Sequence, residues 1–143
     1  MSYPQTKVQA QVQAQAQAHT ELYEYYLTLT SFRETLKLFH FQCKRFAQHK
    51  ASDEVLADFD KLYDNLFETC QGIVGRVQVV DNTLSIKVNA NLSVQDMNKV
   101  TDFVIDQLTL GFYQRWEWGS GVLNIRDEFI GLLEKFKYLL TFD

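Results

Sequence analysis

Residues 49–70, with the sequence HKASDEVLADFDKLYDNLFETC, decide the fold expected for this chain. Their apolar side chains recur every three or four residues and form one wide stripe, as on an amphipathic helix that packs against a core. The apolar set, followed to residue 73, is Val55, Leu56, Phe59, Leu62, Tyr63, Leu66, Phe67, Cys70 and Ile73. Acidic residues at its start favour a helix N-terminus electrostatically. The pattern therefore predicts a helix over Ser52–Val74.

The same stretch carries four candidate metal ligands, His49, Asp53, Asp64 and Glu68, at intervals of 4, 11 and 4 residues. At about 100° per residue these intervals return to nearly the same azimuth, so the four side chains share one stripe of a helix. An imidazole beside three carboxylates suits a divalent transition metal such as Mn, Fe, Co or Zn. Further acidic residues lie on this helix, so a solvated acidic face also explains each carboxylate singly.

Three more helices are expected around this one, over Thr20–Gln48, Ser93–Tyr113 and Val122–Phe142. The first is predicted to turn Leu29, Phe32, Leu36, Phe39, Cys43 and Phe46 inward. The β-branched segment Val77–Val88 fits a short hairpin or an extended crossover. Four helices with a long link between the second and third indicate an all-α, ferritin-like four-helix bundle with a crossover between helices two and three.

Composition sets the size and organisation of the domain. At 143 residues and 46% hydrophobic, the chain is long enough for one domain with a core. Residues 1–18 are expected to be a low-complexity tail, because Gln and Ala alternate there over most of its length. Disorder is the first expectation for this tail, and an extension of the first helix is the second. Residues 19–143 would then form the bundle.

Several classes of protein are disfavoured. The two cysteines show no zinc-site spacing and are expected to be reduced core thiols. The absence of signal-peptide features and of a long apolar run predicts a soluble, intracellular protein without a membrane segment. A net charge of −4 and a pI near 5.3 make nucleic acid an unfavourable partner. No P-loop, nucleophile elbow, Rossmann fingerprint or HExxH motif supports hydrolytic or nucleotide-dependent chemistry.

With His40-Phe41 added upstream, the order of candidate ligands resembles the ferroxidase motif of Dps, the small starvation-type ferritins. In that motif a His followed by an aromatic residue precedes a second His, an Asp, another Asp and a Glu. His49, Asp53, Asp64 and Glu68 match the last three intervals of the motif. His40 lies nine residues before His49, where the family usually has twelve, so His40 fits either a ligand or a histidine satisfied at a helix edge.

The Dps resemblance implies an iron site at His40, His49, Asp53, Asp64 and Glu68, shared between two subunits related by a two-fold axis. The two His and the first Asp would come from one subunit, and the second Asp and the Glu from the other. The protein would then be a homo-oligomer, at least a two-fold dimer and at most a hollow shell. Its function would be ferroxidation with peroxide or oxygen. Dps proteins that coat DNA often use basic tails, whereas this tail carries only Lys7.

A second resemblance, carried by His49-Lys-Ala51 and by residues 71–76 (QGIVGR), is to an uncharacterised group of short ferritin-like proteins from large viruses and bacteriophages. It implies a fold and an origin, with a location in the host cytoplasm or the virion. The rival expectation is therefore a noncatalytic, virus-encoded structural or interaction protein on a degenerate ferritin-like bundle. The shortened interval between His40 and His49 favours that rival.

Overall fold

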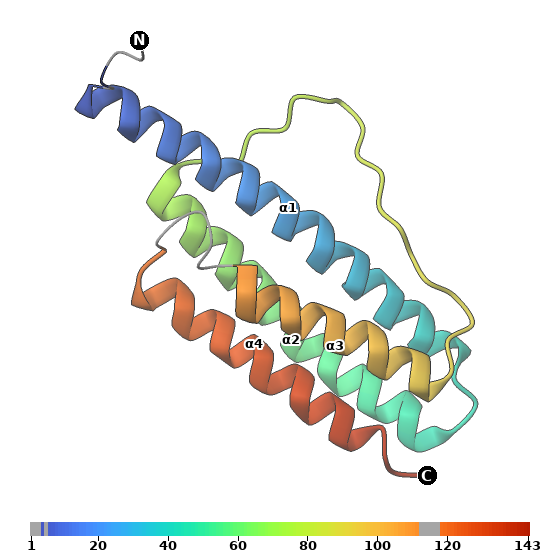
Figure 1. Ribbon diagram of the computed structural model, residues 1–143. Coiled ribbons are helices and arrows are strands. Elements are labelled where there is room, and N and C mark those ends of the chain that lie inside the picture. Colours follow the sequence, from blue (N-terminus) through green and yellow to red (C-terminus); the bar gives the residue numbers. More distant parts are fainter. Residues whose placement is uncertain (1–3, 5, 112–117) are drawn as a thin grey trace.

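The chain forms four helices in the computed structural model, which describes residue 4, residues 6–111 and residues 118–143 (Figure 1). Within those residues there is no strand. The helices are α1 (Lys7–Gln42), α2 (Phe46–Val74), α3 (Val94–Gly111) and α4 (Ser120–Leu139). The prediction of an all-α four-helix bundle is confirmed. None of these helices is long and apolar enough to cross a membrane.

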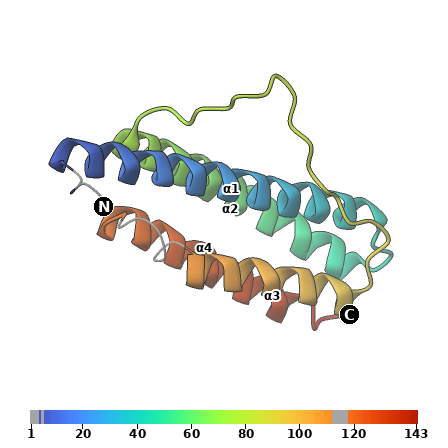
Figure 2. The same cartoon turned by 45° about the horizontal axis from the view of Figure 1, so that its top comes forward.

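The helices pack in a closed ring in which α1 contacts α2 and α3, and α4 contacts the same two helices. Pairs that contact each other run antiparallel, whereas α1 and α4, like α2 and α3, run in the same direction on opposite corners (Figure 1 and Figure 2). The segment 75–93 therefore has to return along the bundle before α3 can begin. It does so beside α1, where the Asn89 amide donates to Thr35 Oγ1 and the Ser31 hydroxyl donates to the Lys87 carbonyl. This segment is extended and forms no hairpin.

The core is centred on Phe59 of α2, which has no exposed surface. Its ring lies 5.7 Å from that of Phe32 on α1 and 5.1 Å from that of Phe129 on α4, measured between centroids. One side chain thus joins three helices. The other large side chains with almost no exposed surface are Leu22, Leu29, Leu36, Leu66, Met97, Leu108, Leu133 and Phe136.

The Gln/Ala tail is helical, which is the second of the two states expected for it. Thr6 and Gln9 form a capping box, with 3.2 Å from the Gln9 amide to the Thr6 hydroxyl and 2.8 Å from the Thr6 amide to Gln9 Oε1. Burial begins at Ala18, and the helix continues through the expected boundary between residues 18 and 19 without a break. Capping and the high helix propensity of Ala and Gln explain how a segment with little core contact continues the helix.

The junction between the first two helices lies earlier than predicted. α1 ends at Gln42, α2 begins at Phe46, and three residues connect them. Phe46, expected in the core, is 76% exposed as a result. Ser52, expected to start the second helix, is buried in the second turn of α2 and donates to the Gln48 and His49 carbonyls. The predicted end of the third helix at Tyr113 lies outside the described residues.

The buried thiol gives the first prediction. Burial, with a contribution from Glu21, raises the pKa of Cys70 to about 12. At pH 8 its thiolate population should therefore be about one in ten thousand, against about one in four for a free thiol with a pKa of about 8.5. In a Cys43→Ser variant, we expect an aromatic disulfide reagent to modify Cys70 at pH 8 only after urea is added. Modification at the rate of the unfolded chain would contradict this burial.

The central ring gives the second prediction. Phe59→Ala should lower the free energy of unfolding by about 3–5 kcal/mol, because it opens a cavity where three helices meet. Phe41→Ala removes a ring that is 68% exposed and should change stability by no more than about 0.5 kcal/mol. Urea denaturation followed by circular dichroism measures both. Equal losses for the two variants would show that Phe59 is not the centre of the core.

Candidate metal site on helix α2

The five predicted ligands divide between a buried position and an exposed face. His40 lies in the last turn of α1 and is 6% exposed. His49, Asp53, Asp64 and Glu68 all lie on α2 and are exposed to solvent. The predicted shared stripe on one helix is therefore present for those four. His40 faces the stripe's first residue from the neighbouring helix.

The two histidines, His40 and His49, form a reciprocal contact across the junction between α1 and α2, which we call the clasp. His40 Nδ1 lies 3.0 Å from the His49 carbonyl oxygen, and His49 Nδ1 lies 3.0 Å from the His40 carbonyl oxygen. The rings stack with centroids 3.9 Å apart and planes inclined by 22°. Ser52 Oγ, also 3.0 Å from His40 Nδ1, completes the contact.

These bonds fix the tautomer of both rings. A carbonyl oxygen only accepts, so each Nδ1 must carry the proton and donate it. In the neutral ring Nε2 is then the atom with the lone pair, and it has no hydrogen-bond partner among the described residues. A histidine that binds a metal through Nε2 almost always donates its other N–H to a carbonyl or carboxylate in this way. The clasp is thus compatible with both a structural role and a ligand role.

The three carboxylates of the stripe make no hydrogen bond or ion pair within the described chain. Asp53 lies one turn after His49, and Glu68 lies one turn after Asp64, so the four residues form two pairs. Eleven residues separate the pairs, which is about 16 Å along a helix. The described residues accordingly contain no group of three or more His, Cys, Asp or Glu that could hold a metal ion. A single copy of the chain offers only half of the predicted ligand set at either end.

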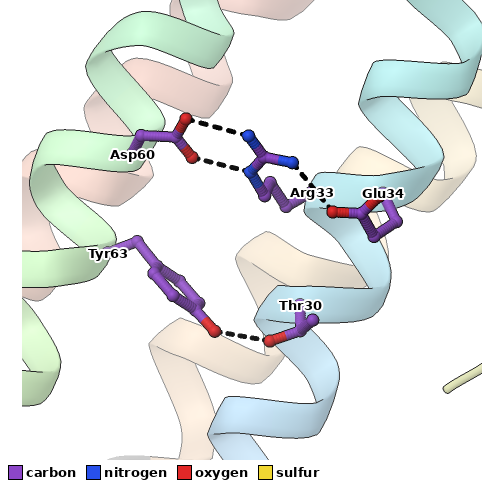
Figure 3. Close-up of polar contacts among 5 residues, drawn as sticks. All are labelled: Thr30, Arg33, Glu34, Asp60 and Tyr63. Atoms are coloured by element: carbon purple, nitrogen blue, oxygen red, sulfur yellow. Dashed lines mark hydrogen bonds and ion pairs between the residues drawn. The ribbon is translucent and has the colours of Figure 1, made fainter. Parts of the chain in front are cut away.

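Asp60, an acidic residue of α2 outside the predicted ligand set, has a partner on α1. Asp60 Oδ1 and Oδ2 accept from Arg33 Nε and Nη2 at 2.8 and 3.1 Å, and Arg33 also donates to Glu34 (Figure 3). The hydrogen bond to Asp60 and the one to Glu34 raise the pKa of Arg33. This forked pair ties α1 to α2 and removes Asp60 from the set of available ligands. The only sign of this pair in the sequence is the presence of opposite charges on two helices.

Tyr63 and Thr30 make a second tie between the same helices (Figure 3). Their hydroxyl oxygens lie 2.5 Å apart, and burial raises the pKa of Tyr63 to about 12. Tyr26 packs on Tyr63 and Phe67. Its role in the described chain is therefore bundle packing. Trp118 is also buried, at the end of the bundle where α4 begins.

Comparison with known proteins adds one relationship. A family model described as "Family of unknown function (DUF5856)" matches residues 40–140. The matched range begins at His40 and contains all five candidate ligands. No curated protein and no solved structure matches the chain.

The clasp gives the third prediction. His40→Ala should lower the free energy of unfolding by about 1–3 kcal/mol, since it removes a buried ring and its hydrogen bond to the His49 carbonyl. His49→Ala removes an exposed ring and should cost less. Urea denaturation monitored by circular dichroism compares the two variants. If His49→Ala proved the more damaging, the clasp would depend on the exposed ring and not on the buried one.

Proposed function

The chain belongs to this family of unknown function, DUF5856, and from that premise we propose that it binds ferrous iron between two copies of itself and oxidises it. The observation that carries the proposal is the symmetry of the ligand spacing. Residue numbers 49 and 68 sum to 117, and so do 53 and 64. Two antiparallel α2 helices related by a two-fold axis near residue 58 would therefore set His49 opposite the partner's Glu68, and Asp53 opposite the partner's Asp64.

The two-fold pairing completes what one chain lacks. Each end of the helix pair would hold one imidazole and three carboxylates, and the axis would generate two such sites. The four side chains are exposed on the outward face of α2, and neither Asp53, Asp64 nor Glu68 has a competing partner among the described residues. Among the described helices α2 contacts α1 and α4, and its outward face is open to a second copy.

The donor set fits iron chemistry. Carboxylate oxygens hold hard Fe³⁺, while imidazole nitrogen helps to retain Fe²⁺. Two Fe²⁺ ions would each give one electron to hydrogen peroxide, which takes up two protons and leaves as two water molecules. The ring of His40 stacks on that of His49 with centroids 3.9 Å apart, so His40 would hold the His49 ring in place for an ion.

The rival function is a noncatalytic structural or interaction protein, and the clasp favours it. Both histidines already have a structural use at the junction between α1 and α2. On this alternative the carboxylates are a solvated face, and removing them leaves the protein's role unchanged. The viral origin suggested by the sequence belongs to this alternative and stays a prediction.

The fourth prediction concerns iron. The purified protein should bind Fe²⁺ in an anaerobic calorimetric titration and then oxidise it when peroxide or oxygen is added, as read by ultraviolet absorbance. Asp64→Ala/Glu68→Ala should abolish both. The control Asp106→Ala/Glu128→Ala also removes two exposed carboxylates, neither of them in the ligand set or on α2, and should retain both.

Subunit mixing tests whether the site spans two chains. A His49→Ala/Asp53→Ala chain and an Asp64→Ala/Glu68→Ala chain should each be inactive alone. A mixed dimer would recover one intact site of two, so random exchange should restore about a quarter of the wild-type sites. Iron binding by wild type without recovery on mixing would contradict a shared site. Absence of binding in wild type would favour the noncatalytic alternative.

A further inference from the structure

We propose that the outward face of α2 is a self-association surface whose occupant is the α2 helix of a second copy, held there by ion pairs and an aromatic anchor without metal. The inference uses the same two-fold pairing as the proposed function. It adds the contacts that keep the two copies together when no iron is bound.

The first support is the charge pattern on one flank of this face. Lys50, Glu54, Lys61 and Glu68 fall within about 40° of azimuth on the helix. All four are exposed, and none forms an ion pair within the described chain. The unpaired charges alternate in sign along the flank. A partner that presents the same flank in reverse order would neutralise them.

A second copy of α2 is such a partner. In the antiparallel pairing that centres the ligand set, facing residues have numbers that sum to 117. Lys50 and the second copy's Glu68 have residue numbers that sum to 118. Glu54 and the second copy's Lys61 have residue numbers that sum to 115. Both pairs are within two residues of the facing position, which long side chains span easily. By symmetry each pair occurs twice, so the surface is complementary to itself.

The second support is Phe46, whose ring is 76% exposed although the rest of its helix buries its aromatic residues. The two-fold pairing sets it opposite position 71 of the second copy, beside Gly72 and Gly75. A Cβ atom added at either glycine would meet no atom within 4 Å, so this end of α2 is open. The ring could lie against that glycine-containing end and lose its contact with water.

The neighbouring exposed ring serves as a comparison. Phe41 is 68% exposed, but it lies on α1, its ring is 5.6 Å from that of His40, and Lys37 Nζ lies 5.0 Å from its centroid. Phe46 has no such contact in the described chain. Ala57, near the centre of the face, is small enough to let two helices approach closely. The α2 face thus combines a small centre, a self-complementary charged flank and an apolar anchor at each end, which together oppose the repulsion between Asp53 and the second copy's Asp64 when no metal is bound.

Sedimentation velocity of the full chain in EDTA tests the proposal. Wild type should be dimeric or larger, and Lys61→Glu or Glu54→Lys alone should weaken self-association at least about tenfold, because like charges then face each other. The double variant Glu54→Lys/Lys61→Glu should regain it. Phe46→Ser should weaken association, whereas Phe41→Ser should not. Circular dichroism confirms that each variant is folded.

The outcomes separate this inference from the proposed function. A wild-type monomer in EDTA that dimerises only with Fe²⁺ would overturn the metal-free contacts and leave the iron site standing. Self-association of unchanged strength in the Lys61→Glu and Phe46→Ser variants would overturn the α2 surface itself. A dimer that shows the charge-swap rescue but binds no iron would support the surface and refute the iron site.

Discussion

Burial of the inner face of α2, centred on Phe59, is the constraint on which the rest of the structure depends. This helix packs against α1 on one side and α4 on the other, and the Phe59 ring touches aromatic rings from both. Once that face is committed to the core, the opposite face must point outward. The positions of the exposed imidazole and carboxylates therefore follow from the packing of the apolar stripe, because the rotation of α2 about its own axis sets the direction of both faces.

The order of the helices imposes a second constraint. α2 and α3 lie on opposite corners and run in the same direction, so the chain must travel the length of the bundle between them. The extended segment 75–93 does this against α1 and leaves the outer face of α2 uncovered. The α1 and α2 helices, by contrast, are joined by three residues and held by the His40 and His49 clasp. The tight turn fixes where α2 starts, and hence which residues its outward face carries.

The residues on the outward face of α2 fit a pair of chains better than a single chain. Its ligand spacing of 4, 11 and 4 is the same read in either direction, and its flanking charges match themselves in reverse. Within one chain the two halves of the ligand set are about 16 Å apart and hold nothing between them. A two-fold axis would convert this separation into two complete sites. The proposed iron chemistry and the proposed self-association thus rest on the same two-fold symmetry, and experiments can test them separately.

The sequence by itself determined four helices, most of the buried face of α2 and the shared stripe of His49, Asp53, Asp64 and Glu68, because helical periodicity is a local property. It did not determine where α1 ends. Cys43, Lys44 and Arg45 include no glycine, proline or capping residue, so the stop comes from contacts between His40, His49 and Ser52 across the junction. Tertiary packing also left Phe46 exposed, paired Asp60 with Arg33 and placed residues 75–93 along α1. Each of these depends on residues distant in sequence meeting in space, and no local pattern records such meetings.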